Sequence, residues 1–229
     1  HMKILLVKPH VYLKVAQSFH GVLHLEPLEL EIVAGGIDPQ HEIRILDLTL
    51  EKKPFKTFTA MLAAFNPDIV GIGGYSNQSG HMKELARLTK EFRSDILVVA
   101  GGVHATIAPK DLKLPELFDV IVRGDGAGNM GDIVRAHREG TAIPETDYVM
   151  TTTATDFDVR ADKPPAPLQK STIDTRPRRD LVDRSQYFTV CSGEPNTKLK
   201  TLFPQVASMR TSVGCPHRCK FCVVHFLAN

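Results

Sequence analysis

The sequence of 229 residues has no long apolar run and no excess of charge of either sign. The apolar stretch near the N-terminus, within HMKILLVKPH, is too short for a signal peptide or a membrane span. We therefore expect a cytoplasmic protein without a membrane partner. A formal net charge of +2 is too small to indicate nucleic acid as a partner.

Two nucleotide-binding motifs are also missing. The pattern GxxxxGK[ST] does not occur, which excludes a P-loop. The pattern GxGxxG should follow the first strand of a dinucleotide-binding unit, but KPHVYLKVAQ stands there, and GDGAGN occurs only after the fifth predicted strand. The sequence thus gives no support for nucleotide hydrolysis or for a bound dinucleotide.

Short, nearly continuous apolar runs alternate with helical patterns in the first part of the chain. Such runs are typical of strands that are covered on both faces. Strands are predicted over residues 3–7, 42–48, 68–74, 96–102 and 119–124, and helices over 57–65, 81–92 and 128–138. This alternation predicts an α/β fold with a doubly wound, parallel, five-stranded Rossmann or flavodoxin-like sheet in the order 2-1-3-4-5.

The character of the sequence changes after Gly140, where Thr, Pro and charged residues replace the periodic pattern. We expect one domain over residues 1–140, a connector over 141–205, and a separate region over 206–229 that opens with a strand at 207–213.

Small residues follow the predicted third, fourth and fifth strands, in GGYSNQSG, GGVHAT and GDGAG. The carboxyl ends of parallel strands form the ligand crevice of such a sheet, and glycine lets a ligand approach the backbone closely. Three such loops predict a broad platform for a large ligand, although glycine is also common in plain turns. About twenty residues between Pro9 and Leu28 separate the first strand from the next helix, and they are expected to fold over the platform as a cover.

Three cysteines stand in the segment GCPHRCKFC with the spacing C-x3-C-x2-C. A zinc site would need a fourth ligand, such as His217 or His225. Alternatively, Cys215, Cys219 and Cys222 hold three irons of a 4Fe-4S cluster and leave the fourth iron open for chemistry. Cys191 stands apart and is expected to be a plain thiol.

The cysteine segment resembles the signature of radical S-adenosylmethionine (SAM) enzymes, in which the motif follows the first strand of a partial (β/α) barrel. The segments PDIVGIGG, VVAGGVHAT, VIVRGDG and PRRDLVDRSQYF resemble, in the same order, the cobalamin-binding class of that family. The resemblance implies three cofactors: cobalamin on the platform, a 4Fe-4S cluster on the cysteines, and SAM on the open iron. The residues that it implies as cobalamin contacts are Ser76, Asn77, Gln78, Gly101, Gly102, His104, Ala105, Thr106, Gly124 and Asp125.

The sequence departs from the family pattern at two places. The family commonly has RGEGE where this chain has RGDGA, and the DxHxxG motif that supplies an axial histidine in other cobalamin proteins is absent. We therefore expect cobalt without a histidine from that motif. His104 is interpreted as a hydrogen-bonding residue in preference to a cobalt ligand, since a ligating histidine needs a positioned partner. Three glutamates are interpreted as a solvated helix face, and three arginines as a solvated or domain-contact surface: Glu26, Glu29, Glu31, Arg176, Arg178 and Arg179.

The resemblance implies a radical methyltransferase that acts on an unactivated carbon or phosphorus centre of an unidentified small molecule, with an external electron donor. A cyclase or rearrangement enzyme and a non-catalytic cobalamin carrier or sensor are the alternatives. An electron-transfer protein is disfavoured, because no fourth ligating cysteine stands near the motif. Because only 21 residues remain from Met209 onward, we expect a truncated barrel, an inactive fragment, and self-association through the unpaired strand.

Overall fold

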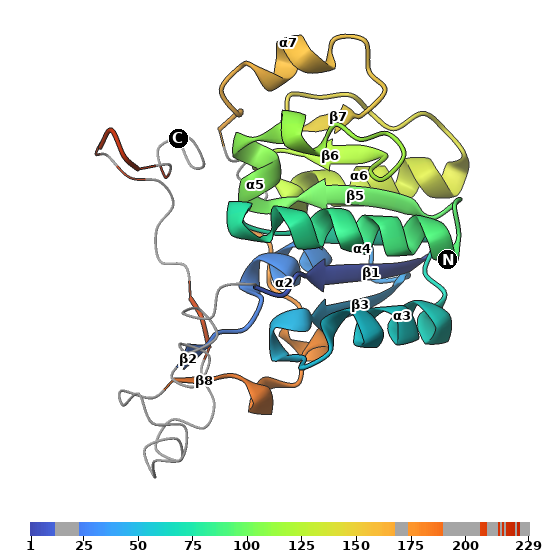
Figure 1. The fold of residues 1–229 in the computed structure, drawn as a ribbon, viewed down its shortest axis with the longest axis vertical. Coiled ribbons are helices and arrows are strands. Elements are labelled where there is room, and N and C mark those ends of the chain that lie inside the picture. The colour runs from blue at the N-terminus through green and yellow to red at the C-terminus, as the bar shows by residue number, and fades with distance from the viewer. Residues whose placement is uncertain are drawn as a thin grey trace.

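The computed structural model describes residues 1–11, 23–167, 174–189, 207–209, 215, 217, 219–222 and 224. Their central feature is a six-stranded sheet in the order β3-β1-β4-β5-β6-β7 (Figure 1). The strands are β1 (Lys3–Lys8), β3 (Glu42–Asp47), β4 (Ile69–Gly73), β5 (Leu97–Gly101), β6 (Val120–Val122) and β7 (Val149–Thr151). The first five are parallel, so the predicted order 2-1-3-4-5 is confirmed.

The sixth strand was not predicted. β7 pairs antiparallel with β6, with Ile121 opposite Met150, although residues 149–151 were assigned to the connector. Three residues are too few to show a period, which is why the pattern did not reveal this edge strand. The connector region also supplies the helix α7 (Phe157–Ala161) and two 3-10 turns, η4 (Arg179–Leu181) and η5 (Arg184–Gln186).

Helices cover both faces of the sheet, as the apolar strands require. In β1, Leu5 and Val7 belong to the core on one face, and Ile4 and Leu6 to the core on the other. The first core is closed by α3 (Pro54–Phe65) and α4 (Ser79–Phe92), and the second by α2 (Leu28–Gly35) and α6 (Gly126–Glu139). Side chains alternate along a strand, so a strand buried on both faces is apolar at every position.

The remaining described elements are short and lie mainly at the ends of the strands. They are η1 (Leu48–Leu50), η2 (Ser76–Gln78), α5 (Gly102–Ile107), η3 (Pro109–Leu112), and the two-stranded pair β2 (Leu23–His24) and β8 (Phe188–Thr189). In Figure 1 the strand arrows point to the side where α5, β2 and β8 lie. The carboxyl edge of the sheet therefore carries most of the irregular chain.

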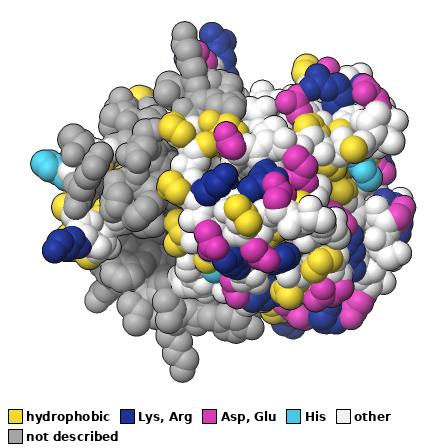
Figure 2. Space-filling model, turned by 90° about the horizontal axis from the view of Figure 1, so that it is seen from above, with side chains coloured by type: hydrophobic (Ala, Val, Ile, Leu, Met, Phe, Trp, Pro, Cys, Tyr) yellow, Lys and Arg dark blue, Asp and Glu magenta, His cyan; other side chains and the backbone are white. Residues whose placement is uncertain are grey.

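The face that carries α7 has mixed charge. Figure 2 shows basic and acidic side chains interspersed there, without a large field of one sign. Three ion pairs join this region: Lys110 to Asp162, Lys113 to Asp158, and Arg160 to Glu145. Among the helices of the described ranges, none is long and apolar enough to cross a membrane.

Candidate functional site

The carboxyl ends of β4, β5 and β6 form what we call the open rim, made of residues 75–77, 101–102, 107 and 124. Two of its large side chains are apolar and exposed, Tyr75 at 53% and Ile107 at 40%. The backbone at Gly102 and Gly124 is exposed as well. The platform predicted from three small-residue loops therefore exists as an edge of exposed backbone with apolar side chains on it.

The glycines of the open rim differ in their surroundings: the backbone of Gly102 packs closely against Gly74, whereas Gly101 and Gly124 have free space where a side chain would lie. Gly102 has φ +83°, and a Cβ there would lie 2.7 Å from the nitrogen of Gly74. A Cβ at Gly101 would meet nothing within 4 Å, and one at Gly124 would meet only the Ala166 carbonyl oxygen, at 3.7 Å. The described chain thus leaves room over Gly101 and Gly124, which fits a large flat ligand lying against the backbone.

A hydrogen-bonded chain of side chains supports the open rim from below. The Nδ1 atom of His104 lies 3.1 Å from Ser76 Oγ, and its Nε2 atom lies 2.9 Å from Asp111 Oδ2. Lys83 Nζ approaches the other oxygen of Asp111 to 2.8 Å. The hydrogen bond from Lys83 lowers the pKa of Asp111 below its usual range, with a further contribution from His104. Both ring nitrogens of the buried His104 contact protein, so this ring is not placed as a cobalt ligand.

Several residues predicted as cofactor contacts are buried and hold the loops in place. Gln78 donates to the Pro9 carbonyl at 2.5 Å and accepts from the Tyr75 nitrogen. Thr106 accepts from the Gly124 nitrogen at 2.9 Å and so joins α5 to the loop after β6. Asp125 caps α6 by accepting from the Gly128 nitrogen. Of the ten predicted residues, those exposed on the rim are Ser76, Asn77, Gly102 and Gly124.

Arg123 is a buried residue whose role the sequence analysis missed. Its guanidinium donates to the carbonyl oxygens of Thr106, Arg160 and Lys163 at 3.2, 2.9 and 3.0 Å. Burial lowers the pKa of Arg123, but each of its three nitrogens donates to a carbonyl oxygen. The arginine in RGDG therefore fixes the chain that follows α7 beside the open rim. Tyr75 and Ile107 were missed as well, although an apolar side chain between small polar residues is a usable signal.

The carboxyl ends of β1 and β3 differ, because later residues of the chain cover them; we call this part the closed rim (residues 8, 26, 31, 47, 179, 187 and 208). Tyr187 is buried there, with its hydroxyl 3.5 Å from Asp47 Oδ2. Burial and the charge of Asp47 raise the pKa of Tyr187. Lys8 Nζ approaches the same oxygen of Asp47 to 3.3 Å.

A second contact of the closed rim holds the chain ahead of the cysteine motif. Glu26 accepts from the Ser208 nitrogen at 2.6 Å and pairs with Arg179. Arg179 donates in turn to the Ser208 carbonyl at 2.6 Å. The interpretation as a solvated face is wrong for Glu26, which is 3% exposed, and for Glu31, which is fully buried, whereas Glu29 is exposed as expected. A helix that the sequence places near the surface can be covered by chain from more than a hundred residues away, and local periodicity carries no trace of that contact.

Glu31 is buried, and neither of its carboxylate oxygens has a hydrogen-bond partner among the described residues. Burial raises its pKa from 4.5 to about 7, with a smaller contribution from the charge of Glu26. The carboxyl group is therefore held close to half-protonated at neutral pH. This residue belongs to the closed rim and faces away from solvent.

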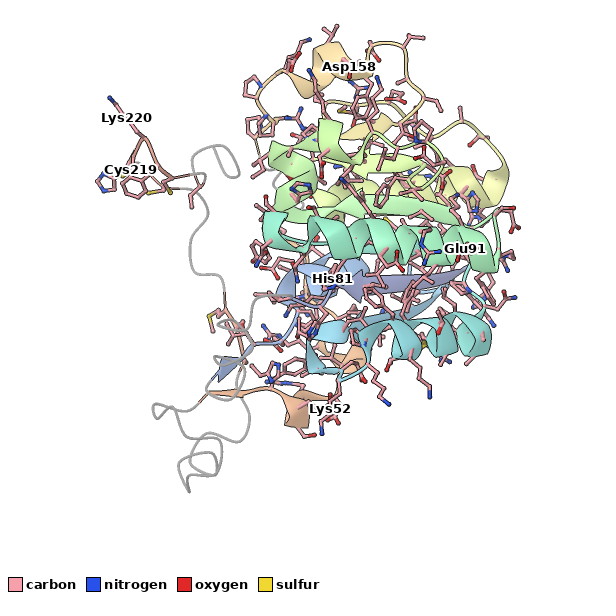
Figure 3. The ribbon with its side chains drawn as sticks, viewed as in Figure 1. Lys52, His81, Glu91, Asp158, Cys219 and Lys220 are labelled. Carbon is pink, nitrogen blue, oxygen red and sulfur yellow. The ribbon has the colours of Figure 1, made fainter. Side chains whose placement is uncertain are left out.

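The cysteine motif is described only in part. Cys215 and Cys219 are exposed, Cys222 is half-buried, and all three are free thiols. The Cys222 nitrogen donates to the Cys219 carbonyl at 3.0 Å, which closes a turn. Figure 3 draws Cys219 and Lys220 well apart from the sheet. The described side chains include no group of three metal ligands, so the geometry of a cluster is not on view. Cys191, residues 210–214 of the predicted strand and most of the predicted covering loop lie outside the described residues.

A family model described as the B12 binding domain matches residues 15–134. This match covers more than half of the chain and includes the strands that end at the open rim. The chain belongs to the B12-binding domain family. The B12-binding domain of this chain thus has the mostly parallel α/β fold described above, with the glycine-lined edge that a flat macrocycle can contact.

Three curated proteins are similar to the chain over much of its length. An uncharacterised methyltransferase of Pyrococcus horikoshii is 28% identical over 96% of this chain and 45% of its own length. The anaerobic magnesium-protoporphyrin IX monomethyl ester cyclase of Rubrivivax gelatinosus is 28% identical over 70% of this chain and 28% of its own. The 2-(S-pantetheinyl)-carbapenam-3-carboxylate methyltransferase of Streptantibioticus cattleyicolor is 26% identical over 83% and 26%. The chain thus spans less than half the length of each relative.

Proposed function

We propose that the open rim binds cobalamin and that the chain is the cobalamin-binding part of a radical SAM methyltransferase. The observation that carries this proposal is the space over Gly101 and Gly124 within a B12-binding domain. Exposed backbone with no side chain above it suits a macrocycle that is recognised over a broad surface. When bound, cobalamin supplies a transferable methyl group, whereas the chain binds and orients it.

The residues proposed to touch the corrin ring are those that remain accessible on the open rim. Ser76 and Asn77 offer side-chain hydrogen bonds, and Gly102 and Gly124 offer backbone. The apolar ring of Tyr75 covers part of the ligand and excludes water. The buried Gln78, His104, Ala105, Thr106 and Asp125 hold these groups in position.

The radical SAM part of the proposal rests on the cysteine motif. Cys215, Cys219 and Cys222 are proposed to hold a 4Fe-4S cluster, to which SAM and an external electron donor would come. The turn between Cys219 and Cys222 supports this assignment, because it brings two of the proposed ligand residues close together in space. The methyltransferase relatives favour methyl transfer, and the cyclase relative makes ring formation a second candidate for the same cofactors.

The proposal is tested by reconstituting the full chain without oxygen, with hydroxocobalamin, iron and sulfide. We expect a corrinoid spectrum at one cobalt per chain, and iron that is lost in a Cys219→Ala variant. Gly101→Leu tests whether the open rim binds the corrinoid. The new Cβ would point into open space, and Gly101 has ordinary extended dihedral angles. This variant should fold normally and lose corrinoid, whereas Gly80→Leu, also in open space but on α4, should keep it. A wild-type protein that is colourless after incubation with excess corrinoid and removal of the free ligand would end the proposal.

A further inference from the structure

The hydrogen-bonded chain below the open rim runs from solvent to the site. It begins at Lys83 on α4, passes through Asp111 on η3 and His104 on α5, and ends at Ser76 on η2. The side chain of His104 is 7% exposed and that of Asp111 is 43% exposed. Ser76 is exposed on the rim. One end of the chain thus meets water and the other meets the space assigned to the ligand.

With His104 neutral, these contacts fix the direction of each hydrogen bond. Lys83 keeps Asp111 ionised, and an ionised carboxylate can only accept. The Nε2 atom of His104 must therefore carry a hydrogen, to donate to Asp111 at 2.9 Å. In a neutral imidazole the other nitrogen is then an acceptor. While His104 is neutral, Ser76 therefore donates its only hydroxyl hydrogen to His104 Nδ1, at 3.1 Å.

A serine that has given its hydrogen to an internal partner keeps only lone pairs for a ligand. We propose that Ser76 is a fixed hydrogen-bond acceptor that makes the open rim select corrinoids bearing amide N–H groups over those bearing carboxylates. His104 and Asp111 act as positioning residues in this selection. This inference rests on the proposed cobalamin site and specifies what that site recognises.

The chemistry of cobalamin explains why an acceptor at Ser76 would favour it as a ligand. The periphery of the corrin ring in cobalamin carries primary amides, each of which offers two N–H donors. A carboxylate in the same place would bring lone pairs against the lone pairs of Ser76, and neither group could satisfy the other. Leaving polar groups unpaired in a contact that excludes water is costly, so the mismatch costs more than a good contact contributes.

The first test needs no ligand. Nitrogen NMR of the imidazole ring at about pH 8, where histidine is ordinarily neutral, should show His104 protonated at Nε2 and bare at Nδ1. Asp111→Asn, a change at a half-exposed side chain, should weaken this preference. A ring protonated at Nδ1 in the wild-type protein would contradict the proposal directly.

The second test compares two corrinoids, cobinamide with its amides and cobyrinic acid with its carboxylates. We expect the full-length protein to prefer cobinamide, and Ser76→Ala to weaken cobinamide binding by about 3- to 10-fold, the value of one hydrogen bond. The same variant should strengthen the binding of cobyrinic acid, because it removes the mismatch. Ser79→Ala is the matched control, because its hydroxyl lies outside the hydrogen-bonded chain. Equal loss for both corrinoids in Ser76→Ala, or no loss for either, overturns the selection while leaving the cobalamin site standing. Absence of any corrinoid binding overturns both.

Discussion

The two halves of the carboxyl edge of the sheet are built from different kinds of residue. At the closed rim, Asp47, Glu26 and Glu31 are buried and are met by later residues of the same chain. At the open rim, the loops end in glycine and small polar residues, with exposed backbone above the strands. The same sheet edge therefore holds its own chain on one side and leaves room for a ligand on the other.

This difference shows what buried charge does in this protein. At the closed rim, the buried Glu26 holds Arg179 and Ser208 beside the start of α2. At the open rim, the half-exposed pair Lys83 and Asp111 contacts the buried His104, which in turn contacts Ser76. Room for a ligand lies where side chains are small, and the chain ahead of the cysteine motif is held where Glu26 is buried.

The largest effect is expected from Gly102→Val, which places a side chain against the backbone of Gly74 at the open rim. The new Cβ would lie 2.7 Å from Gly74 nitrogen and 2.9 Å from its oxygen, at a φ of +83° that disfavours β-branched residues. We expect a loss of about 3 kcal/mol or more in the free energy of unfolding, measured with urea. Gly80→Ala, where a Cβ meets nothing, should change stability by less than about 1 kcal/mol. Equal stability for the two variants would remove the distinction between constrained and free glycines.

The next effect is a pH dependence that comes from the closed rim. The folded pKa of Glu31, about 7, lies above its unfolded value of 4.5. The folded state therefore holds this proton more tightly, and the stability it gives is complete below about pH 4.5 and is lost as the pH rises through 7. The expected loss is roughly 3 kcal/mol. Urea unfolding as a function of pH measures it.

Glu31→Gln isolates this carboxyl group, because the amide has the same shape and no charge to desolvate. The variant should lose the decline between these pH values and be more stable than the wild-type protein at about pH 8. Glu29→Gln, an exposed change on the same helix, should leave the profile unaltered. A wild-type decline that persists in Glu31→Gln would assign it to another group.

The smallest effect is expected from Tyr75→Ala on the open rim. Its side chain is half exposed, so its loss should change the free energy of unfolding by less than about 1 kcal/mol. Corrinoid affinity should fall by about 3- to 10-fold, because the apolar ring no longer covers the ligand. Phe92→Ala provides the control, since this exposed aromatic ends α4 and lies away from the rim. Titration with corrinoid, followed by absorbance, measures the affinity of both variants.

The sheet was predictable because its signal is local. Apolar runs such as residues 3–7 and 96–102 record burial on both faces, and glycines 101, 102 and 124 mark the ends of strands where the chain must turn. The candidate site followed from the same glycines. The predicted contacts were a mixture, however, since Gln78 and Asp125 proved to be internal hydrogen-bonding residues.

The sequence by itself determined the parallel order of the first five strands, the edge at which small residues gather, and the spacing of the three cysteines. Only the tertiary structure decided that β7 joins the sheet, that Arg123 holds the chain after α7, and that Glu26 and Glu31 are buried, with Arg179 and Ser208 against Glu26. The reason is physical: burial on a strand or a turn at its end acts within a few residues, whereas the pairing of a buried charge depends on chain that is distant in sequence and adjacent only after folding.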